Sequence, residues 1–525
     1  MPERAGAAMG FKEDGDFARF VAMGAVGTAV AADVLRERFG HQPIELERYA
    51  MANKVWQSKV KRLRLPDLLC VRCGVRVEAK AKSKLGIVLS HSDTPGRRWD
   101  DGGMRDSDLF AFMRVESPQG AFPPEVAEPE WFSTAALRAS VQHARRSNPK
   151  AASEGSEVTM TWPCWVPRYG GTFKGVDDQD RIVVVDNAGK QRLYWHWRKW
   201  AGKRFRYLLP GDTFEPDSRI VAGIAEPPLS LVCPGLIWDA AAALYDADPV
   251  ERLAAVRATG ILRRVGAAER LSQVAQDERE DWRVRLEANV ALARNDPQRW
   301  VPQVAATINV TDDREQHMEA VLALTEVPAL EAVHALCDIA GRDDLHEDVR
   351  AAAAWGIGQG ASANPERLLP IMLNVNLLVA VHAVGAIDTV SDATRETLMG
   401  WLGSRNQRRA ATAANVLARS RSVDTLLDAY ELGEPAQQWA IYALGKMEAA
   451  VVRVRAGSRL TGSLRAVLEP IWLRELDWLS VDDDPLAALD LQKIRFDPMQ
   501  PTLHSTFGVD PLPRAFPGAH VETPS

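Results

Sequence analysis

Apolar residues recur with helical spacing along the second half of the chain, in a unit that repeats about every thirty residues. Equivalent positions hold small residues, and successive copies lie 29 to 33 residues apart: Gly260, Ala293, Thr325, Gly356, Gly385, Asn415 and Gly445. Such a period, with small residues where helices approach each other, is typical of an α-solenoid. Residues 238–480 are therefore predicted to be stacked helix pairs that bury their apolar sides against their neighbours.

The first 146 residues combine helical and alternating patterns. The small apolar residues of 17–35 predict a buried helix, and 44–63 has apolar residues near helical spacing. Residues 65–82 read as a β-hairpin, 108–115 as a buried strand, and 131–146 as a short helix. Residues 1–146 are therefore predicted to form one α/β domain.

Short strand-like runs fill residues 158–235, and "DNAG" at 186–189 marks a hairpin turn between two of them. This region is predicted to be a small all-β barrel or sandwich. Residues 147–157 read as a linker, and 481–525 as a proline-rich extended tail. The predicted fold class is multidomain, with an α/β domain, a small all-β domain and an all-α solenoid in that order.

Composition limits the classes of function. At 525 residues the chain is too long for one core. Its net charge of -6 excludes a uniformly basic coat, so any nucleic-acid surface must be local. Five scattered cysteines form no disulfide framework and fit the reducing cytosol. The apolar run at 20–32 is shorter than the roughly 20 residues that span a bilayer, so a cytoplasmic protein without a membrane partner is expected.

The hairpin brings three polar residues together, and its turn decides how they pair. A two-residue turn at Arg72 and Cys73 places Asp67 opposite Glu78, whereas a turn one residue later places it opposite Lys80. Either register leaves Asp67, Glu78 and Lys80 on one face, with opposed Cβ atoms about 4.5–5.5 Å apart. A three-residue loop would instead place Asp67 opposite Ala79.

Two carboxylates on adjacent strands suit a hard cation such as Mg²⁺ or Mn²⁺, and a nearby lysine suits phosphoryl chemistry. "PD" at 66–67 followed by "EAK" at 78–80 resembles the motif of the PD-(D/E)xK, restriction-endonuclease-like superfamily. The resemblance implies that Asp67 and Glu78 are metal ligands and that Lys80 is catalytic. It also implies a further acidic ligand from the preceding helix, for which Glu47 or Glu45 is available. The repeats at 238–480 resemble HEAT repeats of the phycobilisome-lyase type.

Two basic clusters stand out in this acidic chain. Ten basic residues lie between Lys54 and Lys84, against only two acidic ones, and surround the candidate metal site. "GKQRLYWHWRKWAGKRFRY" at 189–207 interleaves basic and aromatic residues, which suits stacking of bases but also a barrel with core tryptophans. The predicted nucleic-acid contacts are Lys54, Lys82, Lys84, Arg97, Arg98, Arg198, Lys199, Lys203 and Arg204.

The turn "CVRCG" at 70–74 has the spacing of half a zinc site. A tetrahedral site needs four ligands, and the sequence has no second CxxC motif. His91 or His143 would complete the set only if the fold brought them near. Two structural thiols at Cys70 and Cys73 are therefore the favoured interpretation, with zinc as the alternative.

The leading hypothesis is a Mg²⁺-dependent endonuclease that cuts DNA, with the solenoid recognising a substrate or a protein partner. Fusion of a nuclease to a sensor-like array suits bacterial defence against phage, by association. The first alternative is a HEAT-repeat scaffold whose nuclease-like domain binds nucleic acid without cutting it. The second is a nuclease directed at RNA.

Overall fold

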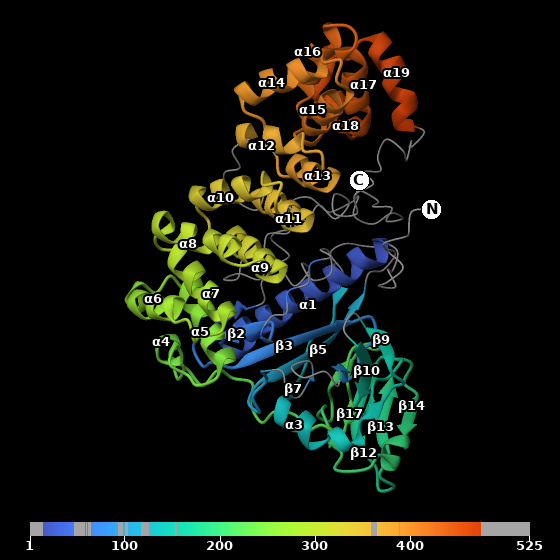
Figure 1. Ribbon diagram of the computed structural model, residues 1–525. Coiled ribbons are helices and arrows are strands. Elements are labelled where there is room, and N and C mark those ends of the chain that lie inside the picture. Colours follow the sequence, from blue (N-terminus) through green and yellow to red (C-terminus); the bar gives the residue numbers. More distant parts are fainter. Residues whose placement is uncertain are drawn as a thin grey trace.

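The structure, a computed structural model, describes residues 14–46, 58, 60, 63, 65–92, 98–99, 103–116, 125–152, 155–358, 365–387 and 389–473. A sheet-rich half comes first, and an all-helical half follows and curves away from it as an arc (Figure 1). The predicted multidomain order is thus confirmed in outline. The predicted tail at 481–525 lies outside the described residues.

The main sheet of the first half has the strand order β1-β2-β3-β5-β6, with β7 also paired to β5. The first three strands form an antiparallel meander, and β5 then runs parallel to β3. The apolar run predicted as a buried strand is β5. The strands are β1 (Pro43–Glu45), β2 (Leu68–Cys70), β3 (Arg76–Lys82), β5 (Leu109–Glu116), β6 (Glu125–Val126) and β7 (Glu130–Ser133).

Helix α1 (Asp14–Phe39) covers one face of this sheet, as the small apolar residues of 17–35 predict. Its buried residues pack with Val77, Ala79 and Ala81 of β3. A Cβ on Gly27 would lie 2.6 Å from the Cβ of Ala81, so only glycine allows the helix this close to the strand. The alternating pattern of β3 thus points its small residues at α1 and its polar residues at the opposite face.

A second sheet, of order β4-β10-β8 with β9 paired to β10, packs near the other face. Its apolar residues share a core with Phe110 and Phe112 of β5.

The range 147–157, predicted as a linker, is occupied by β9 and the start of β10. The predicted helix at 131–146 is confined to α3 and a 3-10 turn at 141–143. The bounds are β4 (Val88–Ser92), β8 (Arg145–Arg146), β9 (Lys150–Ala152), β10 (Gly155–Thr161) and α3 (Thr134–Ala139).

The small β region consists of two short sheets around a core that includes Phe173, Trp197 and Phe214. The predicted hairpin turn at 186–189 joins β13 to β14. The chain leaves β14 at Tyr194 and forms a 3-10 turn at His196–Lys199. The strands are β11 (Cys164–Trp165), β12 (Gly171–Val176), β13 (Ile182–Asp186), β14 (Gln191–Tyr194), β15 (Phe205–Arg206), β16 (Thr213–Phe214) and β17 (Ala222–Gly223).

The helical half is a two-layered stack. Odd-numbered helices contact one another in succession and even-numbered helices do the same from α8 onwards; in Figure 1 the odd layer faces α1. The helices are α4 (Ala240–Ala243), α5 (Pro249–Ile261), α6 (Ala268–Gln276), α7 (Trp282–Ala293), α8 (Pro297–Val310), α9 (Arg314–Thr325), α10 (Leu330–Ala340), α11 (Glu347–Ile357), α12 (Pro365–Met372), α13 (Leu377–Gly385), α14 (Asp392–Leu402), α15 (Gln407–Arg419), α16 (Val423–Glu431), α17 (Ala436–Lys446), α18 (Ala449–Ala456) and α19 (Gly462–Leu473).

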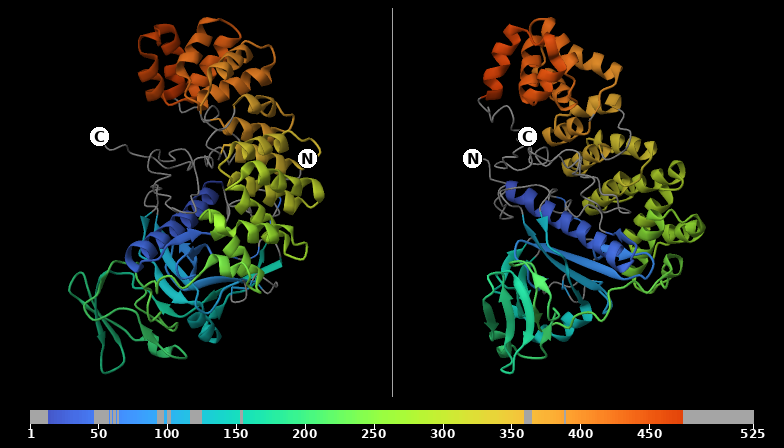
Figure 2. Two further views of the ribbon diagram at one scale, coloured as in Figure 1. Left: turned by 90° about the vertical axis from the view of Figure 1, so that its left-hand side faces the viewer. Right: turned by 180° about the vertical axis from the view of Figure 1, so that it is seen from behind.

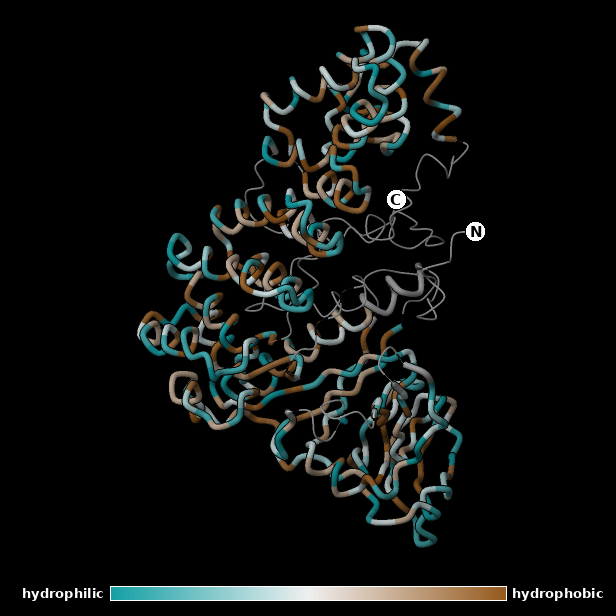
Figure 3. Tube along the Cα trace, viewed as in Figure 1, coloured by the Kyte–Doolittle hydropathy of each residue, from teal (hydrophilic) through white to brown (hydrophobic). Residues whose placement is uncertain are grey.

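The repeated small residues lie where successive odd helices touch. A Cβ on Gly260 would be 2.7 Å from the Cβ of Ala291, and one on Gly356 would be 2.3 Å from Cγ2 of Thr325. Along the stack the tube alternates between apolar and polar colours within single helices, as expected where one side of each helix is buried (Figure 3). The period of about thirty residues is therefore the spacing of helix pairs.

The solenoid begins directly on the main sheet. Ile44, Leu46 and Leu69 share a small core with Ala254 and Ala258 of α5. The views in Figure 2 show the first solenoid helices against the end of the sheet and the later helices far from it. The two halves thus share buried apolar contacts at one end of the stack, in addition to their covalent connection.

None of the helices in the described part of the chain combines the length and apolar character that crossing a membrane requires.

Candidate functional site

The hairpin formed by β2 and β3 has the first of the two predicted favourable registers. Leu68 pairs with Val77, and Leu69 pairs with Arg76. Extended by one residue, this register places Asp67 opposite Glu78. The turn that joins the strands is four residues long, 71–74: the Cys70 N–H donates to the Val75 carbonyl and the Gly74 N–H donates to the Cys70 carbonyl, each at 2.8 Å. Gly74 ends this turn with φ +73, a conformation that favours glycine. The expected two-residue turn at 72–73 is therefore replaced by a longer one that keeps the same strand pairing.

The three predicted catalytic residues are connected through this hairpin. Asp67 lies just before β2, and its carboxylate accepts a hydrogen bond from the backbone N–H of Ala79 at 2.7 Å. The Lys80 ammonium forms an ion pair with the Glu78 carboxylate. Their side chains are 27% and 12% exposed, so the ion pair is largely shielded from solvent. Asp67 therefore braces the strand that carries the other two.

The strand register shows on which side of the sheet Glu45 lies, one of the two candidates for a further acidic ligand. Glu45 pairs with Leu68, and Leu68 pairs with Val77, whose face packs against α1. Directly paired residues share a face, so Glu45 lies on the opposite side of the sheet from Glu78. The expectation that Glu45 completes the metal site is therefore wrong. Glu47 lies outside the described residues.

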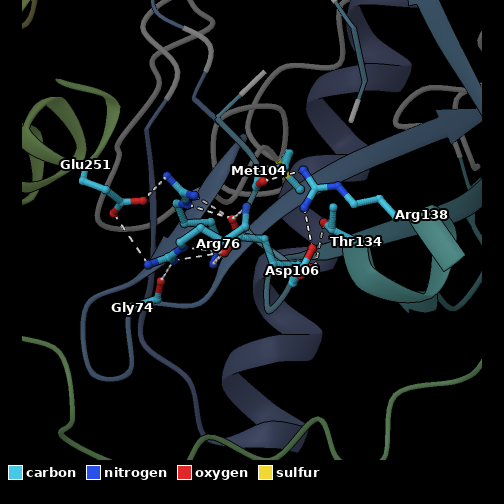
Figure 4. Close-up of polar contacts among 9 residues, drawn as sticks. Gly74, Arg76, Met104, Asp106, Thr134, Arg138 and Glu251 are labelled. Carbon is cyan, nitrogen blue, oxygen red and sulfur yellow. Dashed lines mark hydrogen bonds and ion pairs between the residues drawn. The ribbon is translucent and has the colours of Figure 1, made fainter. Parts of the chain in front are cut away.

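At its turn end, the polar face of β3 is held by an enclosed ion-pair network (Figure 4). Arg76 is fully buried and contacts Asp108 at 2.7 Å and Glu251 of α5 at 3.0 Å. Arg105 pairs with the same two carboxylates and also donates to the Gly74 carbonyl. The network joins the hairpin, the start of β5 and the first long solenoid helix, two residues from Glu78.

The basic residues near the hairpin that were predicted to contact nucleic acid differ in how far they are exposed to solvent. The Lys82 ammonium donates to the Val88 carbonyl at 2.9 Å, and burial together with the charge of Lys80 lowers its pKa to about 8. Lys84 and Arg98 are exposed. Lys82 is therefore partly buried and hydrogen-bonded within the protein, whereas the charge of Lys84 is exposed to solvent. Lys54 and Arg97 lie outside the described residues.

The basic residues of the β region lie on one exposed segment around Trp195, which is 40% exposed. The Lys199 ammonium lies 4.5 Å from the centre of that indole ring. Lys203 contacts Glu226 at 3.6 Å, and Arg204 contacts Asp180 at 2.9 Å. Arg198 is exposed and donates to the Gln179 carbonyl. Of the tryptophans that a barrel core would hold, Trp197 is buried but Trp195 is exposed, because the chain forms a 3-10 turn at His196–Lys199 and does not continue as a strand.

Four potential metal ligands meet at the tip of the same hairpin. The ligand atoms of His41, Cys70, Cys73 and Cys233 all lie within 4.8 Å of one another. They come from the loop after α1, the end of β2, the turn, and the segment between β17 and α4. Among the residues that the structure describes, no other group of three or more histidine, cysteine or acidic side chains comes together in this way.

The cluster is largely buried, and hydrogen bonds connect its groups. The hydrogen bond from the Cys73 thiol, aided by His41, lowers the pKa of the Cys70 thiol to about 3, while the same partnership raises that of Cys73. Burial alone would lower the pKa of His41, but hydrogen bonds to Cys70 and to the Leu231 carbonyl raise it. The site thus stabilises a thiolate beside hydrogen-bond donors.

Sequence reasoning found half of this cluster. The CxxC spacing predicts Cys70 and Cys73, but the histidines named as further candidates, His91 and His143, are not the ligand that the fold supplies, and no motif marks His41 or Cys233. His91 lies on β4 and His143 in the turn after α3, away from this cluster. The available signal was that His41 and Cys233 both flank predicted elements, where loops carry ligands.

No family model matches this sequence. No curated protein matches it either. Among solved structures, the complex of CpcE and CpcF of phycocyanin lyase from Nostoc sp. aligns over 47% of this chain and 99% of that one, at 16% identity and a TM-score of 0.23. Human deoxyhypusine hydroxylase aligns over 45% and 95%, at 17% identity and a TM-score of 0.19. An engineered protein aligns over 44% and 94%, at 19% identity and a TM-score of 0.20.

Proposed function

We propose that the protein is a Mg²⁺-dependent endonuclease whose site is formed by Asp67, Glu78 and Lys80. The observation that carries the proposal is the hairpin register, in which Leu68 pairs with Val77. Extended by one residue, this register supports a position of Asp67 opposite Glu78, with Lys80 two residues further along β3. DNA is the favoured substrate, and defence against phage is the favoured setting. Neither follows from the fold, because one fold can host many functions. Both rest on the association of a nuclease with a sensor-like array.

The strand order around the hairpin supports this proposal. A meander of β1, β2 and β3 followed by β5 parallel to β3 agrees with the resemblance to PD-(D/E)xK nucleases. The chain departs from that pattern between β3 and β5. The described residues of this crossover include the strand β4, which pairs with β10 in the second sheet.

The donor set fits a hard divalent cation. Asp67 and Glu78 offer carboxylate oxygens, and Mg²⁺ is commonly held by one or two carboxylates while keeping several waters. One oxygen of Asp67 is engaged by the Ala79 N–H, which fixes the carboxylate beside β3. Bound there, the cation would act as a Lewis acid toward a phosphate oxygen and lower the pKa of a bound water.

In this proposal Lys80 stabilises negative charge in the transition state. Its ammonium lies against Glu78, in a site that is mostly shielded from solvent. A cation in such surroundings stabilises negative charge that develops on phosphorus more strongly than it would in open water. In the proposed reaction Lys80 therefore stabilises the pentavalent transition state, while the two carboxylates position the cation.

We also propose that the solenoid recognises a substrate structure or a protein partner. Glu251 of α5 contacts Arg76, so the first repeat touches the strand that carries Glu78 and Lys80. A superhelical stack offers an extended surface for such recognition. Recognition on the array and cleavage on the sheet would then occur on one continuous framework.

The test is cleavage of plasmid DNA and matched RNA by purified protein, with Mg²⁺ or Mn²⁺ and without added metal. Asp67→Asn, Glu78→Gln and Lys80→Ala are expected to lose at least about a hundredfold in rate, as removal of electrostatic stabilisation at a reacting group does. Asp67→Asn keeps an oxygen that can accept from Ala79, so the hairpin can still close. Lys174→Ala, an exposed lysine on β12, is the matched control and should cleave like the wild type.

A binding-only scaffold is the second candidate, and the hydrogen bond from Ala79 to Asp67 favours it, because it gives that carboxylate a purely structural use. In that case nucleic acid would bind without divalent metal and without turnover. Equal behaviour of the wild type and all three variants, for both DNA and RNA, would reject the nuclease.

A further inference from the structure

The cysteine and histidine cluster at the hairpin tip has the dimensions of a mononuclear metal site. Tetrahedral zinc binds sulfur at about 2.3 Å and histidine nitrogen at about 2.0–2.1 Å, so its sulfur ligands lie about 3.8 Å apart and sulfur and nitrogen about 3.5 Å apart. Nδ1 of His41 lies 3.4 Å from Sγ of Cys73, and all four ligand atoms lie within 4.8 Å of one another. The spacing therefore suits one ion between them.

The surroundings orient the ligands as a metal requires. Nε2 of His41 lies 2.8 Å from the Leu231 carbonyl, to which it can donate, and Nδ1 is the nitrogen that faces the cluster, 3.4 Å from Sγ of Cys73. Once Nδ1 has released its own proton, its lone pair is available to a metal ion. The backbone N–H of Gln42 donates to Sγ of Cys70 at 3.3 Å, a bond that stabilises a thiolate. These partners would fix both a neutral imidazole and an anionic sulfur.

We propose that His41, Cys70, Cys73 and Cys233 bind one structural zinc ion. Three thiolates and an imidazole form a borderline-soft set that selects zinc over Mg²⁺ or Ca²⁺. With four protein ligands the site would be closed, leaving no position for substrate, as in structural zinc sites. Binding releases the protons of the cysteine thiols to solvent and leaves the imidazole neutral.

The ion would fasten three parts of the chain together. Cys70 and Cys73 hold the hairpin turn, and Cys233 belongs to the segment that leads from β17 into the solenoid. That segment already docks on the turn, because the Arg72 carbonyl accepts from the N–H groups of Ile237 and Trp238. Zinc would thus fix the turn three residues after Asp67 and five before Glu78, which couples it to the hairpin independently of any catalysis.

The first test is the metal content of the full chain, measured by inductively coupled plasma mass spectrometry after purification without a metal column. About one zinc per chain is expected for a single closed site. Cys233→Ser and His41→Ala should lose the zinc, whereas His41→Cys should retain it through a fourth thiolate. Cys164→Ser and Cys337→Ser, which change thiols outside the cluster, should bind like the wild type.

A second measurement does not depend on variants that fold. Replacement of zinc by Co²⁺ in the wild type should give thiolate charge-transfer bands and the visible bands of tetrahedral cobalt. Chelation should raise hydrogen exchange at the hairpin turn and around 231–238, and leave the last solenoid helices unchanged. Asp67→Asn should keep its zinc, so a failed nuclease and a failed zinc site are told apart.

Three results would overturn the proposal. The first is wild-type protein that neither contains zinc nor gives the cobalt bands. The second is a disulfide between Cys70 and Cys73 in freshly prepared protein, detected by mass spectrometry of alkylated peptides. The third is iron with inorganic sulfide in place of zinc, since a two-iron cluster divides its ligands between two metal ions.

Discussion

The guanidinium of Arg76 donates to the Asp108 carboxylate at 2.7 Å, with neither side chain exposed to solvent. Asp108 also accepts from the backbone N–H groups of Arg76 and Arg105. One carboxylate therefore fixes the start of β3, the chain before β5 and the charge of a buried arginine at once.

Asp108→Asn is expected to lower the free energy of unfolding by about 3–5 kcal/mol, because it leaves a buried arginine with a partial counter-charge. Asp106→Asn removes the neighbouring ion pair with Arg138, in which the aspartate is 73% exposed, and should cost less than about 1 kcal/mol. Urea unfolding followed by tryptophan fluorescence measures both. Similar losses for the two variants would show that burial of the Arg76 pair does not matter.

Gly356→Ala should destabilise the solenoid by about 1–3 kcal/mol, because the added methyl group overpacks the contact between α11 and α9. Its Cβ would lie 2.3 Å from Cγ2 of Thr325. Gly400→Ala on α14 is the control, since that position is exposed and a Cβ there meets nothing within 4 Å. It should stabilise by up to about 1 kcal/mol through helix propensity. Thermal melts followed by circular dichroism should move in opposite directions.

Lys82 should give the protein a rise in stability with pH. Burial lowers its pKa from 10.5 to about 8 in the folded chain. Between these values the unfolded chain keeps a proton that the folded chain has lost, so stability increases as pH rises through this window. Below it, both states are charged and the full cost of burial is present.

Urea midpoints measured on both sides of pH 8 test this expectation, and Lys82→Met should lack the rise. Lys84→Met, which changes an exposed lysine two residues away, should keep it. Parallel curves for the wild type and Lys82→Met would contradict the expectation.

Lys199→Ala should weaken binding of nucleic acid and reduce the slope of log affinity against log salt by about 1, as loss of one phosphate contact does. Lys199 lies beside the exposed ring of Trp195. Arg204→Ala should leave the slope unchanged, because Arg204 is already paired with Asp180. Fluorescence anisotropy with a labelled oligonucleotide at several salt concentrations measures both. An unchanged slope for Lys199→Ala would remove this segment from the binding surface.

Features set by local spacing could be predicted from the sequence. The hairpin at 65–82 follows from its two strand-like runs and from Gly74, which supplies a positive φ at the end of the turn. The choice among its possible registers did not follow from the sequence, because the turn has four residues, 71–74. The solenoid follows from small residues such as Gly260 and Gly356. They recur because, in each repeat, a helix packs closely against the equivalent helix of the next repeat. In both cases the information lies within a few dozen consecutive residues.

Features that join distant segments could not be predicted in this way. Cys233 lies 160 residues beyond Cys73, and only the path of the chain after β17 brings them together. Strands β9 and β10 lie partly in the range of the expected linker, 147–157, because β9 pairs with the start of β10 and β10 pairs with β4, partners that the loop-like composition of this range does not reveal. The face on which Glu45 lies could not be predicted, because 44–63 has apolar residues near helical spacing, whereas Pro43–Glu45 forms a strand that pairs with β2.

The contact between Arg76 and Glu251 makes the two halves of the molecule mechanically dependent. A partner that bends the array far from the sheet also pulls on α5, and α5 cannot shift without either breaking this contact or dragging β3 along. A displacement of α5 is therefore coupled to the hairpin that carries Glu78, both through this ion pair and through the apolar core that Ala254 and Ala258 share with Leu69.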